Sequence, residues 1–216
     1  MPQILLDELS PPQRLALSYA PASARKATLA LLALDARLAA ILRRRSEAVL
    51  AQMRLAWWRD RIAEDPQAWP RGDAVLDALR DWREPAALGP LVDGWEALLG
   101  DDLEARTIDD FARGRGEAFA QLARELGAGK EAGLAESCGR QWAFGDLAVN
   151  LSDAPERAQA IDAAAALPPC PALSRALRPL AVLAGLARRS LARGGTPLLE
   201  GPAAMLLAVR LGITGR

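Results

Sequence analysis

The chain contains few of the residues that β-strands favour. Ile, Val and Thr together number 16 among 216 residues, whereas alanine, leucine and arginine are abundant. Because β-branched residues stabilise strands and these three abundant residue types favour helices, the sequence predicts an all-α protein. Apolar residues make up 51% of the chain and charged residues 25%, which is enough apolar material for one core. We therefore expect a single domain over residues 1–216.

Charge and rare residues exclude several kinds of function. Lys plus Arg and Asp plus Glu are both 27, so the chain has no excess positive charge to attract nucleic acid. It has no histidine, which excludes His-based triads and His-ligated metals. The two cysteines, Cys138 and Cys170, lack the spacing of a thiolate zinc site. They could form one bridge, although a reducing cytosolic compartment is the simpler interpretation, and the sequence leaves their pairing open.

No segment is predicted to cross a membrane or to direct secretion. The first residues include Asp7 and Glu8 and lack the basic stretch and apolar run of a signal peptide. The longest apolar runs, such as 27–34 and 203–209, are too short to span a bilayer. We expect a cytoplasmic protein with at most peripheral membrane contact.

Prolines, glycines and capping residues divide the chain into about eight to ten helices. Pro11, Pro12 and Pro21 bound a short opening helix. The segment 24–65 is long for one globular helix, so we expect two helices, or one that bends near Ser46. Further helices are predicted over 73–83 and 89–99, over 107–126 with a capping box at Thr107, over 130–151, over an alanine-rich stretch that a cap at Asp153 begins, and over 172–193 and 202–211.

The most distinctive segment is aromatic and runs from Gln52 to Asp60, with Trp57 and Trp58 adjacent. Neighbouring residues on a helix point about 100° apart, so one tryptophan is predicted to lie in the core and the other along a groove. Arg54 and Trp58 lie four positions apart on one face, which permits a cation–π contact or a shared groove wall. The plainer alternative is a large aromatic core plug with solvated arginines.

Metal-diphosphate chemistry requires several acidic residues on one helix face, and the chain has few acids at that spacing. Asp35 is a lone acid, because the next two positions on its face are apolar. Asp60 and Glu64 have the required spacing, but arginines flank Asp60, so we interpret the pair as a solvated face. Asp153 and Glu156 have the pattern of a capping box.

Two further charged groups lie in unusual surroundings. Asp146 is set among apolar residues of its helix, so its burial would demand a partner, for which Arg140 or Asn150 are candidates. The arginines at 43–45 could meet a phosphate or an anionic lipid, although three adjacent arginines at a helix bend are more often a solvated surface.

The stretch Leu55-Ala-Trp-Trp-Arg-Asp60, preceded by Gln52-Met-Arg54, resembles a helix typical of the squalene/phytoene synthase family. The resemblance extends in order and spacing over most of the chain, but its specific part is residues 52–60. It implies an isoprenoid-synthase-like bundle around a central cavity. Enzymes of that family join two prenyl diphosphates, using Mg²⁺ held by two aspartate-rich motifs. Arg25, Arg54 and Trp58 are the substrate-binding residues that the resemblance implies.

The chain departs from the family at the metal motifs. Asp35 stands alone where a second acid is expected at position 39, which is Ala39. Asp153 and Glu156 match two acids of the second motif, but Arg157 occupies the place of another. Each lost ligand removes a charge-assisted contact to the departing diphosphate, and two or three losses of about 3 kcal/mol each would slow catalysis by about 10⁴–10⁶.

The sequence therefore favours a non-catalytic squalene/phytoene-synthase-like protein. It resembles the branch that assists assembly of respiratory complex I, so the expected partners are a prenyl diphosphate or another isoprenoid lipid, or complex I subunits, with no cofactor. The alternative is an active prenyltransferase, in which Asp35, Asp153 and Glu156 would hold Mg²⁺ and Arg25 and Arg54 would meet the diphosphate. A third hypothesis is an interaction module that presents Trp58 and the arginines at 43–45 to a partner.

Overall fold

The computed structural model describes residues 2–43, 48–100 and 103–216. All regular elements in these ranges are helical, and eleven of them are α-helices, one more than the expected maximum. The first four are α1 (Pro2–Glu8), α2 (Pro11–Ser18), α3 (Ala22–Arg43) and α4 (Ala48–Ala63). The next four are α5 (Ala74–Leu79), α6 (Gly89–Ala97), α7 (Ala105–Glu125) and α8 (Ala132–Asn150). The last three are α9 (Ala154–Ala165), α10 (Arg178–Leu191) and α11 (Gly201–Thr214).

The predicted all-α class is confirmed, and most helix boundaries lie close to their predicted positions. The segment 24–65 forms two helices, whereas the bend predicted near Ser46 lies outside the described residues, as do Arg44 and Arg45. Asp73 caps α5 by accepting hydrogen bonds from two backbone N–H groups of its first turn. Asp153 caps α9 by accepting one such bond, from the backbone N–H of Glu156.

The capping box predicted at Thr107 is wrong. Helix α7 begins two residues earlier, at Ala105, with Glu104 at its N-cap. The backbone N–H of Ile108 already donates to the carbonyl of Glu104 over 3.1 Å, so Thr107 lies inside the first turn. A capping motif is a weak signal where the residues before it can continue the helix.

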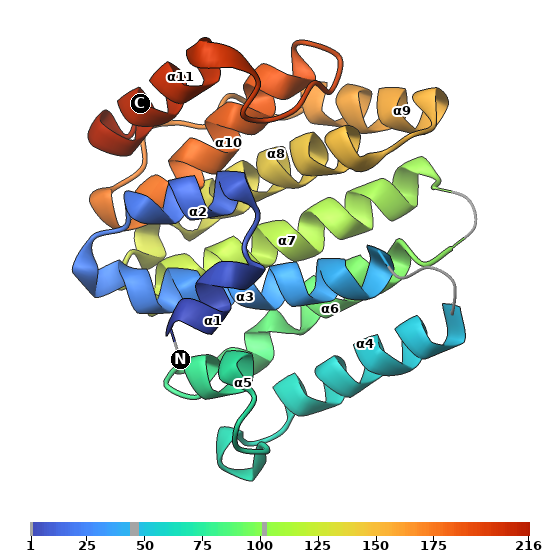
Figure 1. Cartoon of the computed structure of the whole chain (residues 1–216), viewed down its shortest axis with the longest axis vertical. Coiled ribbons are helices and arrows are strands. Elements are labelled where there is room, and N and C mark those ends of the chain that lie inside the picture. The colour runs from blue at the N-terminus through green and yellow to red at the C-terminus, as the bar shows by residue number, and fades with distance from the viewer. Residues whose placement is uncertain (1, 44–47, 101–102) are drawn as a thin grey trace.

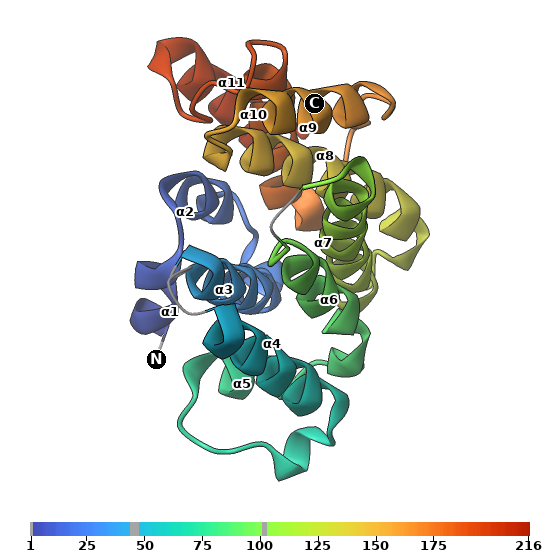
Figure 2. The ribbon, with the colours of Figure 1, turned by 90° about the vertical axis from the view of Figure 1, so that its right-hand side faces the viewer.

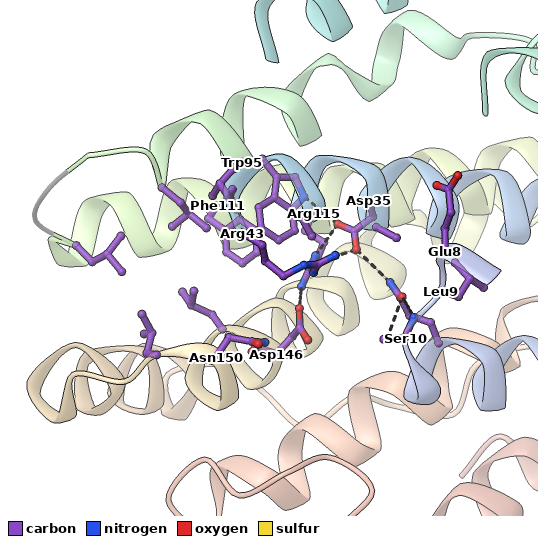
Figure 3. Close-up of a pocket in the computed structure, with 18 of the residues that line it drawn as sticks. Glu8, Leu9, Ser10, Asp35, Arg43, Trp95, Phe111, Arg115, Asp146 and Asn150 are labelled. Atoms are coloured by element: carbon purple, nitrogen blue, oxygen red, sulfur yellow. Dashed lines mark hydrogen bonds and ion pairs between the residues drawn. The ribbon is translucent and has the colours of Figure 1, made fainter. Parts of the chain in front are cut away.

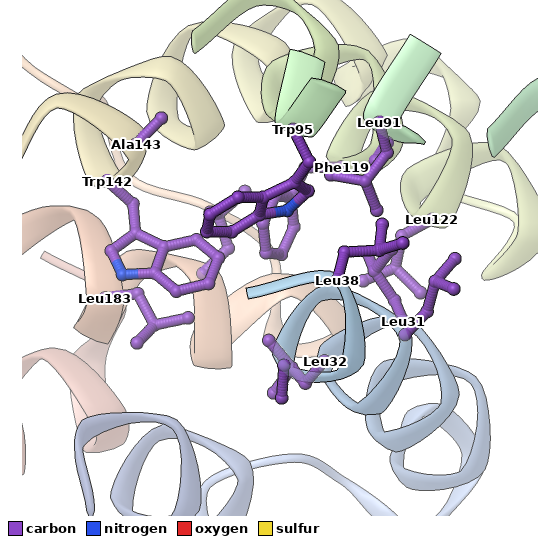
Figure 4. Packing of buried hydrophobic residues seen from close by; sticks show 14 of the residues in the cluster. Leu31, Leu32, Leu38, Leu91, Trp95, Phe119, Leu122, Trp142, Ala143 and Leu183 are labelled. Atoms are coloured by element: carbon purple, nitrogen blue, oxygen red, sulfur yellow. The ribbon is translucent and has the colours of Figure 1, made fainter. Parts of the chain in front are cut away.

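Helix α7 lies in the middle of the molecule, packed against α6 on one side and α8 on the other, and α10 packs on α8 (Figure 1). The turned view places α3 beside this stack, with α1 and α2 outside it, while α4 and α11 lie toward opposite ends of the long axis (Figure 2). The buried apolar side chains of the described residues form one cluster. Leucines of α3, such as Leu31 and Leu38, belong to this cluster together with Trp95, Phe119 and Trp142 (Figure 4).

Two glycines allow the central helices to approach closely. A Cβ atom on Gly114 would lie 2.1 Å from the backbone oxygen of Pro90, at the crossing of α7 and α6. A Cβ atom on Gly145 would lie 2.4 Å from the Cβ atom of Ala187, at the crossing of α8 and α10. Both crossings therefore depend on the absence of a side chain, and they set the spacing of the helices that carry the site described below.

A disulfide joins Cys138 of α8 to Cys170, in the segment that precedes α10, with the two Cα atoms 5.3 Å apart. The sequence left this pairing open and favoured reduced thiols, so the bridge corrects that interpretation. No helix in the described part of the chain is both long enough and apolar enough to cross a membrane.

Candidate functional site

Asp35 lies near the middle of α3 and is 2% exposed. Four N–H groups from three other helices reach its carboxylate. Trp95 Nε1 donates to Oδ1 over 2.9 Å, and Gln13 Nε2 donates to Oδ2 over 3.3 Å. Arg115 Nε and Nη2 donate to Oδ1 and Oδ2, each over 3.0 Å. Both oxygens are therefore saturated by protein donors, as a buried carboxylate requires.

Arg115 lies on α7 and is also 2% exposed. Its third nitrogen, Nη1, donates to Oδ2 of Asp146 on α8 over 2.9 Å. The guanidinium carbon lies 4.2, 4.8 and 5.0 Å from the ring centroids of Trp142, Phe111 and Trp95. A planar guanidinium can form a bidentate pair at its edge while its faces contact aromatic rings, which explains why arginine suits this position.

The cluster of Asp35, Arg115 and Asp146 has two carboxylates and one guanidinium. Burial raises the pKa of Asp35 above its usual value, an effect that Arg115 opposes. Burial disfavours the charged form of Arg115, but the attraction of Asp35 and Asp146 outweighs it and raises the pKa of the guanidinium. Asp146 is the member of the cluster that solvent reaches, since its side chain is 28% exposed. The uncompensated negative charge therefore lies toward Asp146.

This cluster forms part of the wall of a cavity of about 630 Å³ (Figure 3). Apolar side chains from α3, α8 and the segments around α6 line much of it, including Ala39, Leu42, Leu98, Leu103, Leu147 and Leu151. Polar groups occupy other parts of the wall, including Glu8, Ser10, Arg43, Asn150, Ser152 and Glu156. The volume lies within the range of roughly 300–1,000 Å³ typical of small-molecule sites, and the mixed lining suits an amphipathic ligand.

A second, smaller cavity of about 280 Å³ lies between α3 and α4. Arg54, Trp57 and Trp58 line it from α4, and Arg37 and Ile41 line it from α3. Trp58 is 4% exposed and Trp57 is 41% exposed, so one indole is buried and the other lies partly exposed along this groove, as predicted. Arg54 and Trp58 share the wall of this groove, which confirms that part of the prediction.

The three predicted substrate-binding residues do not come together. Arg25 is exposed, and its Nη1 donates over 3.3 Å to the backbone oxygen of Leu17 near the end of α2. Arg54 and Trp58 line the smaller cavity, whereas Asp35 lines the larger one. The sequence could not exclude a common site, because helical spacing relates residues on one helix and says nothing about which cavity each helix faces.

The three predicted metal ligands are also divided. Asp35 and Glu156 both line the larger cavity, but Asp35 is held by Arg115. The carboxylate of Asp153 instead accepts a hydrogen bond over 2.9 Å from the backbone N–H of Glu156, as the cap of α9. Among the residues that the structure describes, no three acidic or cysteine side chains are grouped so that they could hold a metal ion. These residues do not fit the Mg²⁺ cluster that the resemblance implies.

Arg115 is the principal site residue that the sequence did not reveal. It stands between two glycines, Gly114 and Gly116, and flanking glycines on a helix mark places where neighbouring helices approach closely. The predicted partners of Asp146 are wrong. Arg140 pairs with Asp109 instead, and Asn150 Nδ2 donates over 2.7 Å to the backbone oxygen of Asp146 rather than to its carboxylate.

Comparison with models of protein families, with curated proteins and with solved structures finds no match to this chain.

Proposed function

We propose that this chain is a squalene/phytoene-synthase-like protein that binds an isoprenoid lipid in the larger cavity and does not catalyse prenyl transfer. The observation that carries the proposal is the ion pair between Asp35 and Arg115. Asp35 stands where the resemblance places the first metal ligand, and both of its oxygens already accept hydrogen bonds from a buried guanidinium.

A metal ion at Asp35 would have to displace Arg115. The guanidinium lies against three aromatic rings and also pairs with a second carboxylate, so displacing it would break all of these contacts. Breaking a buried pair of this kind costs about 3–5 kcal/mol, because a charge is left without a partner. The pair therefore occupies the place of a metal site, and the chemistry of diphosphate departure has no electrophile to support it.

The cavity nevertheless keeps the features of a lipid site. Its apolar wall includes Leu98 and Leu103 between α6 and α7 and Leu147 and Leu151 at the end of α8, and its volume exceeds that of the smaller groove by more than twofold. An extended prenyl chain could bury its methyl groups against these leucines, which is favourable by about 25 cal/mol for each Å² removed from water.

The experiment uses the full chain and two separate readouts. Isothermal titration with farnesol and geranylgeraniol should show saturable binding, and Ala39→Trp, which places an indole in the cavity, should abolish it. Ala158→Trp, on the exposed face of α9, is the matched control. Farnesyl or geranylgeranyl diphosphate with Mg²⁺ should release no pyrophosphate above buffer. Turnover that is lost in Asp153→Ala would instead establish the active prenyltransferase, with Mg²⁺ held by Asp35, Asp153 and Glu156.

A second candidate function, assistance in assembling respiratory complex I, is favoured by exposed apolar side chains of α4. Val49, Leu50, Met53 and Trp57 are all exposed and follow one another along this helix. An exposed apolar row of this kind is typical of a surface that another protein covers. The complex I subunits that the resemblance implies are the partners we propose for it.

A deletion strain separates this role from lipid binding. NADH–quinone oxidoreductase activity should fall in the strain and return with the wild-type chain. The variant Met53→Ser/Trp57→Ser should fold normally but fail to restore this activity. Ala39→Trp, which fills the larger cavity and leaves α4 unchanged, should restore it. Full restoration by the α4 variant would reject this role for the helix.

A further inference from the structure

We propose that the larger cavity takes a single-chain amphiphile whose head group donates hydrogen bonds and carries no negative charge, such as a long-chain alcohol or amine. The proposal rests on the proposed function, because it names the polar chemistry of the ligand that the cavity would hold. It departs from the diphosphates that the family resemblance implies.

The charged side chains of the cavity lining determine which head groups the cavity favours. The described residues of its lining include four carboxylates, of Glu8, Asp35, Asp146 and Glu156, and two guanidiniums, of Arg43 and Arg115. Glu8 is paired with Arg37, which lies outside the lining. Once Arg115 is assigned to Asp35, the lining residues that the structure describes retain two carboxylates, of Asp146 and Glu156, and one guanidinium, of Arg43. The described part of the lining therefore carries a balance of one negative charge, which disfavours an anionic head group.

Asp146 is the hydrogen-bond acceptor in the cluster that a ligand in the cavity could reach. Its Oδ2 accepts from Arg115, whereas its Oδ1 makes no hydrogen bond among the described residues. The side chain is 28% exposed and lines the cavity, close to Asn150 (Figure 3). A carboxylate accepts hydrogen bonds and donates none, so a hydroxyl or ammonium group is its natural partner.

The buried guanidinium that could bind a phosphate, that of Arg115, is already engaged. Arg115 directs three of its N–H groups to carboxylates, and aromatic rings lie against it. Arg43 is exposed, so water already solvates its guanidinium. From the described lining residues, a phosphate in the cavity would exchange its own hydration for one exposed arginine and two carboxylates, which is unfavourable.

The test compares three probes that share one tail and differ in the head group: dodecylamine, dodecanol and dodecyl phosphate. Each is titrated into the full chain at neutral pH, below its micelle concentration. The amine and the alcohol should bind at least about tenfold more tightly than the phosphate, a factor that corresponds to about 1.4 kcal/mol. Ala39→Trp should abolish this binding, whereas Ala158→Trp should not.

The outcomes separate the two proposals. Binding of the phosphate as tight as that of the amine would overturn the head-group assignment and leave lipid binding intact. Absence of binding by all three probes, and by farnesol, would overturn both proposals together.

A charge variant tests the role of Asp146 itself. Asp146→Asn keeps the shape of the side chain and should reduce the preference for amine over phosphate by about tenfold. Asp109→Asn, which removes a carboxylate outside the cavity lining, is the matched control and should leave that preference unchanged. An equal preference in Asp146→Asn and wild type would overturn the assignment of Asp146, and circular dichroism of each variant verifies its fold. The wild-type probe series decides the head-group class independently of any variant.

Discussion

Arg115 on α7 and Asp35 on α3 form a bidentate ion pair in which both N–O distances are 3.0 Å and both side chains are almost completely buried. The pair joins two helices through residues that are 80 positions apart in the sequence. It is surrounded by groups that complete its hydrogen bonding, including Trp95 and Gln13. A buried pair of this kind does not by itself add much stability, but removal of one partner leaves the other charge uncompensated.

Replacing Arg115 should therefore be costly. Arg115→Met leaves Asp35 without its guanidinium, and we expect the free energy of unfolding to fall by about 3–5 kcal/mol. Urea denaturation followed by circular dichroism measures the change. Arg113→Met is the matched control, since Arg113 lies two residues away, is half exposed and pairs with Asp110 at the surface, so its loss should cost less than about 1 kcal/mol. An equal loss of stability in the two variants would contradict the conclusion that Arg115 is the buried partner of Asp35.

The titration of Asp35 should change the free energy of unfolding as the pH changes. Burial raises its pKa above the ordinary value of 3.8, so the native state binds this proton more tightly than the unfolded chain does. The stabilisation from that proton is complete below the ordinary pKa and is lost as the pH rises through the raised one. The free energy of unfolding of the wild type, minus that of Asp35→Asn, should therefore decrease as the pH rises from about 4. A difference that grows with pH would show that the carboxylate is instead favoured in its ionised form.

Reduction of the bridge between Cys138 and Cys170 should destabilise the protein. The bond closes a loop between positions 32 apart, and loop entropy predicts a contribution of about 3–4 kcal/mol. Thermal unfolding of the wild type with and without a reductant measures it. Cys170→Ser should lower the stability in the absence of reductant, and reductant should then have no further effect on that variant.

Two glycines of α8 should respond in opposite directions to alanine. A Cβ atom at Gly145 would meet the backbone and Cβ of Ala187 within 2.7 Å, so Gly145→Ala should cost about 1–3 kcal/mol as the helices separate. Gly133 is exposed, and a Cβ atom added there would have no neighbour within 4 Å, so Gly133→Ala should stabilise the helix by about 0.5–1 kcal/mol. Chemical denaturation of both variants tests whether α8 and α10 are in contact as described.

The adjacent tryptophans of α4 should differ in their contribution to stability. Trp58 is buried in the core, and Trp58→Ala should lower the free energy of unfolding by about 3–5 kcal/mol. Trp57 is 41% exposed, so Trp57→Ala should cost much less and should blue-shift the average fluorescence by removing a solvated indole. A larger loss in Trp57→Ala would reverse the assignment of the two faces.

The sequence by itself determined the elements of this protein, because helix propensity, proline positions and caps act over a few residues. The all-α class, the start of a helix at Asp73, the cap at Asp153 and the different surroundings of Trp57 and Trp58 were all predictable from local patterns. The failed capping box at Thr107 shows the limit of the same reasoning, since neighbouring residues could extend the helix past the motif.

Only the tertiary structure decided which charged side chains pair with one another in the wall of the larger cavity. Asp35 and Asp153 have the same ionisable group, yet one is neutralised by a buried arginine and the other caps an exposed helix end. Arg115 has no local feature that identifies its partner, because the partner is supplied by a helix crossing. The charge of the cavity is a property of which side chains meet across helices, and that depends on packing distances that no short stretch of sequence records.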